Sequence, residues 1–415
     1  MAPDDGVHRS AVSDASFAPA VPLPSRDAER WEALLSSRFI ICVGSGGVGK
    51  TTVSASIAYA AARQGKRALV ITIDPARRLA NSLGLERLPG HEVAIASQTR
   101  GEMLAMTLDT KTVFDGIVEQ FIDNPATRAQ ITENAFYGHM VNALSGTQEY
   151  MAVDKLFQLS QRADIDLVVL DTPPMAHALD ILDAPRRMLA LIDSRAFQWF
   201  VRPAMGPGAF GLWVIGKSSS IILRSLAVFV GKQFLRDLAS FLAGLGSLLP
   251  ALTERSAAVE KLLRGPQTRF VIVTSPAAAT AAEASYLRGC LAERDMPFAG
   301  YVVNRVHPRF PGTEAPLGEL EPETFLAACP PANLYASRPE LAREIAAGLI
   351  ENLRRYARLA AQDESVVAEL ATRAGGGTAA DLIATIPMFP EDVHDIDGLA
   401  RIAAALFDRG GGGDT

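Results

Sequence analysis

Residues 44–51 read GSGGVGKT, and the segments on either side indicate what this glycine-rich stretch connects. Residues 39–43 (FIICV) are apolar and rich in β-branched side chains, which favours a strand. Residues 52–63 (TVSASIAYAAAR) are rich in alanine and other good helix formers. A strand, a glycine turn and a helix in this order are the setting in which G-x-x-x-x-G-K-T forms a phosphate-binding loop.

The residues of this loop suit a triphosphate ligand. Glycines let backbone N–H groups converge on phosphate oxygens, and the start of the following helix adds a favourable field for anions. Lys50 would neutralise the phosphates, and the Thr51 hydroxyl would bind Mg²⁺. The sequence therefore predicts a nucleoside triphosphate site, with ATP and Mg²⁺ as cofactors. Its candidate loop residues are Gly44, Ser45, Gly46, Gly47, Val48, Gly49, Lys50, Thr51 and Thr52.

The composition narrows the class of protein. A chain of 415 residues has room for one large domain or two smaller ones. Its formal net charge of -6 gives no global attraction to nucleic acid, so we expect no nucleic-acid partner. Cys42, Cys290 and Cys329 lie far apart in the sequence and form no C-x-x-C, so neither a disulfide framework nor a thiolate metal site is expected.

Neither end of the chain contains a continuous apolar segment. Residues 1–30 are rich in Pro, Ala, Ser and Asp at their start and predict a disordered leader rather than a secretory signal, and residues 409–415 predict a flexible tail. No stretch reaches the ~20 uninterrupted apolar residues of a membrane span. We expect a cytoplasmic protein, and the mean hydropathy of +0.15 leaves a peripheral membrane association open.

Short apolar runs recur along the chain with helical patterns between them. Their hydrophobicity is continuous, which indicates strands buried on both faces of a mainly parallel sheet. The expected fold is therefore a doubly wound α/β domain over residues 38–408, with ligands at the carboxyl ends of its strands. Residues 109–162 and 176–264 read as helices and predict an inserted helical subdomain, and a long helix is expected from about residue 339 to 373. The predicted strands after the first are 68–73, 103–108, 167–170, 270–273, 300–303 and 382–386.

Two aspartates close predicted strands. Asp74 follows the second strand and would orient the attacking water or act on Mg²⁺, although capping of the next helix is an alternative. Asp171 ends the strand 167–170 and would support Mg²⁺ as the partner of the phosphate loop. The segment Thr172-Pro173-Pro174 after it would sense the terminal phosphate, and for His177 a structural hydrogen bond is as good an explanation as chemistry.

These motifs, in their order and spacing, resemble one family. GSGGVGKTT, ITIDPA, DTPPMAH, VVNRV and IPMFPEDV are similar to segments of the arsenite-pump and tail-anchored-protein-targeting ATPases, over about residues 38–407. GTQEYMA (146–152) and LDAP (182–185) look like a bacterial subgroup of that family. The resemblance implies ATP hydrolysis by a dimer whose nucleotide state is coupled to a hydrophobic client helix or a membrane partner.

The resemblance also implies roles for individual residues. Asp74 matches the water-positioning aspartate of the first switch, and Asp171 the aspartate that opens the second switch. Together with the loop chemistry, this makes Lys50 and Asp74 the candidate catalytic residues, and Thr51, Asp74 and Asp171 the candidate metal ligands. His177 matches the histidine of the second switch. Asn304 matches an asparagine that reads adenine, whose amide offers both a donor and an acceptor. Pro387, Met388 and Phe389 match the loop against the adenine ring.

At Ser45 the chain departs from the family pattern, in which a lysine reaches across the dimer to the partner's phosphates. A hydroxyl supplies no positive charge to a phosphoryl transition state. Three outcomes stay open: slow hydrolysis by a homodimer, a heterodimer with a lysine-bearing paralogue, or substitution by Arg77 or Arg78. The widely separated cysteines also depart from a metalloid-binding thiolate site.

Residues 219–250 form the longest apolar-rich stretch, and Arg224, Lys232 and Arg236 leave a wide apolar face on the predicted helix. A buried helix, a groove for a hydrophobic client and a membrane-surface helix are all consistent with it. The leading functional hypothesis is an ATP-driven dimeric switch. The alternatives are an ATPase subunit that energises an anion exporter of the arsenite type, and a weakly hydrolysing, nucleotide-regulated scaffold.

Overall fold

The strand β1 (Phe39–Gly44) lies inside an eight-stranded sheet of the computed structural model. All its residues are buried, and alternate side chains enter opposite cores: Phe39, Ile41 and Val43 one, and Ile40 and Cys42 the other. This double burial explains the continuous apolar run in the sequence. The structure describes residues 25–74, 77–134, 137, 147–195, 232–309, 320–328, 338–374 and 382–408.

The sheet has the strand order β3-β4-β2-β5-β1-β6-β7-β8, and every pair is parallel except the pair of β3 with β4. The order reverses direction at β1, the point where open α/β sheets bind ligands. The strands after β1 are β2 (Arg67–Thr72), β3 (Val93–Ala94), β4 (Glu102–Thr107), β5 (Leu167–Asp171), β6 (Thr268–Thr274), β7 (Phe298–Val306) and β8 (Leu382–Pro387).

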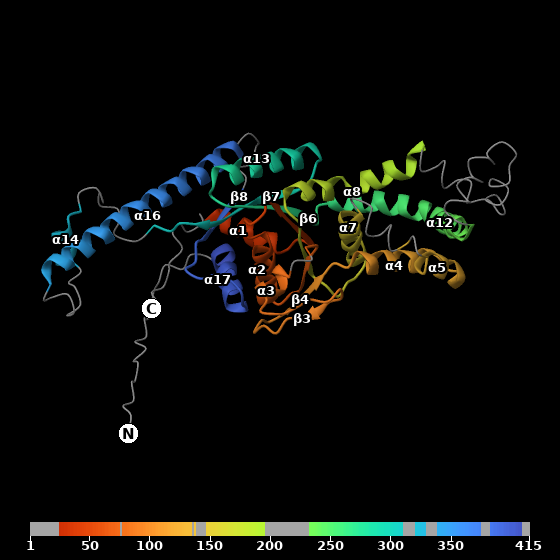
Figure 1. The fold of residues 1–415 in the computed structure, drawn as a ribbon, viewed down its shortest axis with the longest axis horizontal. Helices are drawn as coiled ribbons and strands as arrows, with labels where there is room; N and C mark the ends of the chain where they lie inside the picture. The colour runs from red at the N-terminus through yellow and green to blue at the C-terminus, as the bar shows by residue number, and fades with distance from the viewer. Residues whose placement is uncertain are drawn as a thin grey trace, which may run out of the picture.

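Helices cover both faces of the sheet (Figure 1). On the face that receives Ile40 and Cys42, the packed helices are α1 (Ser25–Leu34), α2 (Lys50–Arg63), α3 (Arg78–Ser82) and α17 (Ile396–Phe407). On the other face, the core includes side chains from α4 (Thr110–Phe121), α5 (Pro125–Thr132), α7 (Thr147–Ser160), α8 (Met175–Asp193), α12 (Lys232–Leu263), α13 (Ala278–Glu293) and α16 (Pro339–Ala374). The expected doubly wound, mainly parallel α/β fold is thus confirmed.

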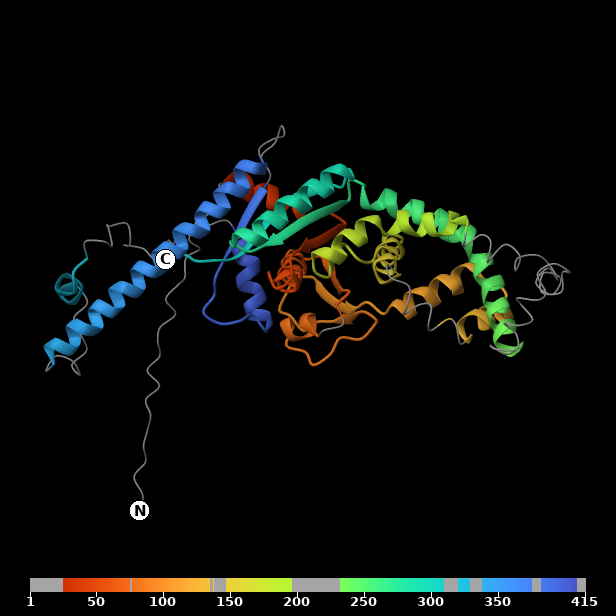
Figure 2. The ribbon, with the colours of Figure 1, turned by 45° about the horizontal axis from the view of Figure 1, so that its top comes forward.

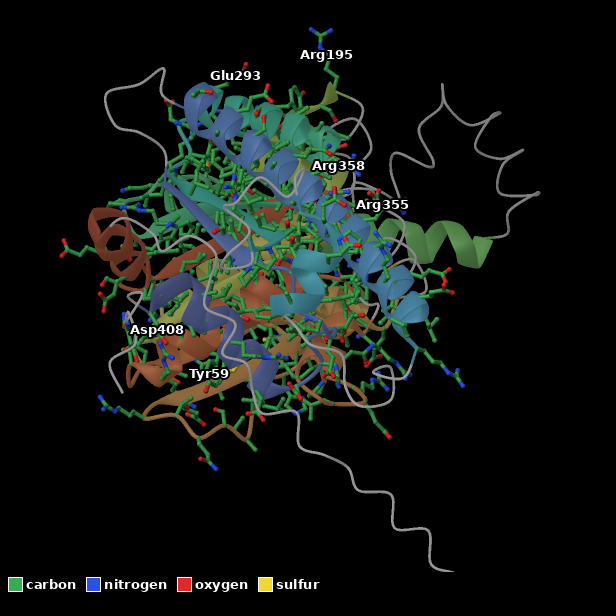
Figure 3. All side chains as sticks on the ribbon, turned by 90° about the vertical axis from the view of Figure 1, so that its left-hand side faces the viewer. Tyr59, Arg195, Glu293, Arg355, Arg358 and Asp408 are labelled. Carbon is green, nitrogen blue, oxygen red and sulfur yellow. The ribbon has the colours of Figure 1, made fainter. Side chains whose placement is uncertain are left out.

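The helices of the second face extend beyond the sheet in two directions (Figures 1 and 2). On one side α8 and α12 run side by side over α4, α5 and α7, and on the other α16 projects with the short helix α14 (Pro322–Ala328) against it. Arg355 and Arg358, labelled in Figure 3, lie on the exposed surface of α16. Within the described part of the chain, no helix has the length and apolarity to cross a membrane.

Most predicted elements are present, with adjusted bounds. The predicted strands all occur, and the long helix spans Pro339–Ala374. The predicted helical stretch from residue 109 contains separate helices α4 and α5, and the Asn124 side chain caps the second of them. The two-residue strand β3 was not predicted. The predicted leader, residues 1–30, overlaps α1, which begins at Ser25, so its last residues are helical rather than disordered. Residues 1–24 and 409–415 lie outside the described residues.

Candidate nucleotide site

The turn between β1 and α2 needs glycine at defined positions. Gly44 has φ +152°, and a Cβ there would lie 2.0 Å from the carbonyl oxygen of Val273 on β6. Gly49 has φ +92°, and a Cβ there would lie 2.2 Å from the Asn304 amide nitrogen. Because no side chain caps α2 at Gly49, its first N–H groups stay available to a ligand. The turn therefore has the geometry of an anion cradle at a helix N-terminus.

Lys50 is buried at the start of α2. Its Nζ donates to the carbonyl oxygens of Gly44, at 2.9 Å, and Ser45, at 2.6 Å. Burial lowers the pKa of this ammonium, and the nearby Asp171 carboxylate opposes that shift. The Lys50 ammonium is thus held at the loop by two neutral carbonyl oxygens. Phosphate oxygens of a bound nucleotide would replace them, because anionic acceptors bind an ammonium more strongly.

Asp171 is the buried centre of the site. One of its oxygens, Oδ2, accepts hydrogen bonds from the hydroxyls of Thr51, at 2.8 Å, and Thr72, at 2.9 Å. Its other oxygen, Oδ1, is buried without a hydrogen-bond partner in the structure. Burial raises the pKa of Asp171 to about 6 against the opposing effects of both hydroxyls and of Lys50. An unpartnered buried carboxylate oxygen beside a threonine hydroxyl fits a divalent cation.

Asp74 lies half-buried just past the end of β2. Its backbone N–H donates to the Thr72 hydroxyl at 3.2 Å, and its Oδ2 lies 3.6 Å from Arg78 Nη1. The N-cap position of α3 is occupied by Arg77 rather than by Asp74. Pro75 and Ala76 lie outside the described residues.

A cavity of about 330 Å³ is lined by six of the fifteen predicted site residues, and Asp171 is not among them. Thr172 and Pro174, from the segment after β5, also line it, as does Arg78. The predicted site residues that line this cavity are Gly47, Gly49, Lys50, Thr51, Thr52 and Asp74.

Ser45 is buried and turned toward α13, where its hydroxyl donates to the carboxylate of Glu283. The structure separates the two arginines that sequence reasoning offered as substitutes for a lysine at this position. Arg78 lines the nucleotide cavity, whereas Arg77 lines a neighbouring one. Of the two, Arg78 is therefore the one that lines the same cavity as Lys50 and Thr51.

The predicted adenine-binding residues do not line the nucleotide cavity. Asn304 is buried on β7 and donates its amide to the Val48 carbonyl at 2.8 Å. Pro387 ends β8, Met388 is exposed, and Phe389 lies beneath the guanidinium of Arg401, 5.0 Å from the ring centre. Their adenine contacts stay a prediction. The side chain of His177, within α8, lies outside the described residues.

Cys42 and Cys290 are buried free thiols. Burial raises the pKa of Cys42 to about 12, which keeps it a neutral thiol, and Cys290 is buried on α13. Cys329 is outside the described residues. Among the described residues, no three or more His, Cys, Asp or Glu side chains cluster so as to hold a metal ion. Nucleotide-bound Mg²⁺ does not need such a cluster, because it takes one or two protein ligands and completes its shell with phosphate and water.

Thr72 and Glu283, which contact predicted site residues, were not predicted from the sequence. Thr72 is the last residue of β2 and lies two residues before Asp74, so its position at a strand end near a predicted site residue was a usable signal. Glu283 had no local signal, because its contact with Ser45 joins residues 238 positions apart. Asn81 and Ser82, which also line the cavity, belong to α3 and were not predicted.

Comparison with known proteins gives a consistent picture. Residues 37–207 match the family model described as anion-transporting ATPase. The chain is 29% identical over 157 residues to "ATPase ASNA1 homolog 2" of Paramecium tetraurelia, covering 37% of this chain and 46% of that protein. It is 28% identical over 187 residues to "Putative arsenical pump-driving ATPase" of Halobacterium salinarum, covering 43% of this chain and 28% of that protein.

A longer match is to "ATPase GET3C" of Arabidopsis thaliana, with 25% identity over 287 residues, 66% of this chain and 68% of that protein. The chain spans a little under half the length of the Paramecium relative that it matches. The match to the family model includes the loop, Asp74 and Asp171, which all fall within residues 37–207.

Proposed function

This chain belongs to the ArsA and GET family of ATPases, which its residues 37–207 match, and from this premise we propose that it binds Mg²⁺ with ATP and hydrolyses the nucleotide to ADP and phosphate. The observation that carries the proposal is the buried, unpartnered Oδ1 of Asp171, whose other oxygen is held by Thr51 and Thr72. A magnesium ion there would neutralise charge on the triphosphate.

The chain's own residues supply the rest of the chemistry. The N–H groups of the loop and of the first turn of α2 bind phosphate oxygens. Lys50 turns from the carbonyls of Gly44 and Ser45 to the phosphates and adds its positive charge. Asp74, which lines the same cavity, orients the attacking water and accepts its proton. Thr172 and Pro174, which line the cavity, would contact the terminal phosphate.

We further propose that the nucleotide state moves the helices on the second face of the sheet. Pro174 lines the cavity and is followed at once by α8. From α8, Asp183 forms a pair of 2.9 Å hydrogen bonds with Arg294 at the end of α13, and Arg186 bonds Glu260 of α12 at 2.9 Å. A shift of the phosphate-sensing segment therefore has a continuous route of contacts to α12.

The task proposed for these helices is to handle a hydrophobic client helix or a membrane partner, in a dimer. Support comes from the family membership and from the apolar residues 219–250, of which 219–231 lie outside the described residues. A second candidate is the driving of an anion exporter, which the description of the matching family favours. The buried thiol of Cys42 offers no metalloid ligand for that task.

Calorimetric titration with ATP tests the proposed site. We expect Mg²⁺-dependent binding by the wild-type chain and a loss of affinity of at least about tenfold in Lys50→Ala, because the variant removes the loop's own cation. Arg63→Ala at the far end of α2, where Arg63 pairs with exposed Asp408, removes the same charge away from the cavity and is the matched control. Equal affinities in wild type and Lys50→Ala would overturn the assignment.

A further inference from the structure

A second cavity, of about 390 Å³, lies beside the nucleotide cavity, and the side chain of Asp74 lines both. It opens at the carboxyl ends of β2 and β4, where Thr72 and Thr107 are paired in register. Ligands of open α/β sheets bind at this edge. Among the residues that the structure describes, no aromatic side chain lines the second cavity on which a nucleotide base would stack.

Arg77 and Arg87 give this cavity its positive charge. Both are exposed, and among the described residues neither guanidinium has a carboxylate within ion-pair distance. The lining contains one carboxylate, that of Asp74, which has Arg78 at 3.6 Å on the nucleotide side. Two guanidinium groups and one carboxylate therefore line the second cavity among the described residues. The carboxylate, that of Asp74, already lies next to a third guanidinium, that of Arg78.

The backbone supports this division of charge. Arg77 and Arg78 are adjacent in sequence, yet Arg77 lines the second cavity and Arg78 the nucleotide cavity. Arg77 has φ +20°, outside the conformations that residues with a side chain prefer. Such backbone strain persists where the surrounding structure requires it and concentrates at ligand sites.

We propose that the second cavity binds a tetrahedral inorganic oxyanion and receives the phosphate that hydrolysis releases past Asp74. Arg77 and Arg87 would supply charge-assisted hydrogen bonds, and Thr107 would add a hydroxyl. The oxyanion site stands on the cavity and its arginines alone. The further proposal, that this cavity receives the phosphate released by ATP hydrolysis, rests on the proposed function.

Calorimetric titration of inorganic phosphate into protein saturated with Mg²⁺ and ADP tests the site, because the nucleotide then fills the phosphate loop. We expect one phosphate bound by the wild type, and binding at least about tenfold weaker in Arg87→Ala and Arg77→Ala. Arg87→Lys should recover most of the loss through its charge. Arg100→Ala removes an exposed arginine that lines neither cavity and should bind as the wild type does. Equal phosphate affinity in Arg87→Ala and Arg100→Ala would overturn the site.

Two further arms separate this proposal from the proposed function. If ADP does not bind, the nucleotide site fails, and phosphate titration of the nucleotide-free variants still decides whether Arg87 matters more than Arg100. If ATP is cleaved, single-turnover measurements with a phosphate sensor follow the product. Release of phosphate should slow at least about threefold in Arg87→Ala, because a favourable binding site for the departing phosphate is lost. The rate of ATP cleavage should stay unchanged. Unchanged release despite weaker phosphate binding would overturn the exit route.

Discussion

The hydroxyl of Ser45 in the phosphate loop donates a hydrogen bond to the carboxylate of Glu283 on α13. The carbonyl of the same serine accepts from Lys50 Nζ at 2.6 Å, so Glu283, Ser45 and Lys50 form one chain of contacts. At this position the family resemblance implies a lysine that reaches a partner subunit. In this chain the position holds Ser45, a neutral hydrogen-bond donor, and the Glu283 carboxylate accepts its hydrogen bond.

This contact sharpens the prediction for Ser45→Lys. A lysine introduced alone would meet the Glu283 carboxylate within its own subunit, and the resulting ion pair would hold it away from a partner's phosphates. We expect Ser45→Lys combined with Glu283→Gln to raise kcat at least about tenfold, since a cation aimed at transition-state charge lowers the barrier. Ser45→Lys alone should give a smaller gain. Steady-state kinetics with sedimentation in a transition-state analogue provides the measurement.

Glu283→Gln alone is the matched control, because it removes the carboxylate without adding a lysine. A double variant that dimerises but shows no gain in kcat would contradict a limiting role for the missing lysine. That result would favour the nucleotide-regulated scaffold or an obligate heterodimer.

The buried carboxylate of Asp171 makes stability depend on pH. Because its pKa is raised to about 6 in the fold, the folded state holds its proton more strongly than the unfolded state. This contribution to stability is complete below the unfolded pKa, ~3.9, and is lost as the pH rises through about 6. Asp171→Asn should therefore stabilise the nucleotide-free protein, and its advantage should be larger at pH 7.5 than at pH 5.0 by about 1.4 kcal/mol.

Denaturant unfolding at the two pH values measures this difference. The asparagine carbonyl still accepts from Thr51 and Thr72, so loss of those hydrogen bonds does not obscure the comparison. The same variant should lose the Mg²⁺ dependence of ATP binding. An advantage that shrinks as the pH rises would contradict the assignment of a destabilising buried carboxylate.

A buried ion pair ties α7 to α12. The guanidinium of Arg255 pairs with the carboxylate of Asp154, bonds Gln120 at 2.7 Å and lies 5.1 Å from the Phe157 ring centre. Arg255→Ala would leave Asp154, which is 0% exposed, without its cation. We expect a loss of about 3–5 kcal/mol in the free energy of unfolding.

Denaturant midpoints measure this loss. Arg358→Ala on the exposed surface of α16 removes a partly screened charge and should change stability by less than about 0.5 kcal/mol. Replacing Asp154 and Arg255 together with Leu and Met should cost less than Arg255→Ala, because no unpaired charge is then buried. A small effect of Arg255→Ala would show that the pair does not hold these helices together.

Local patterns predicted the parts of the site that are continuous in sequence. The loop, with Lys50 and Thr51, is one segment, and Asp171 ends a buried apolar strand whose register against β1 and β2 brings it to Thr51 and Thr72. These features follow from periodicity and from the rule that parallel strands end at one edge. The continuous hydrophobicity of the strands predicted the mainly parallel sheet.

Features that depend on tertiary packing were not predictable in this way. The approach of Glu283 to Ser45 requires α13 to lie over the loop, which no local pattern specifies. β3 has two residues and pairs antiparallel to β4 at the sheet edge, so it carries too little periodicity to recognise. The Asn304 amide was assigned to adenine by resemblance, whereas in the structure it contacts the Val48 carbonyl.

The rate of Mg²⁺-dependent ATP hydrolysis by the wild type and by Asp74→Asn tests the central claim most directly. Asp74 lines the nucleotide cavity, and its carboxylate is the candidate group that orients water there. We predict measurable turnover by the wild type, ATP affinity within about threefold in the variant, and a kcat lower by roughly two orders of magnitude or more. Full turnover by Asp74→Asn, or none by a wild-type protein that binds ATP and dimerises, would contradict it.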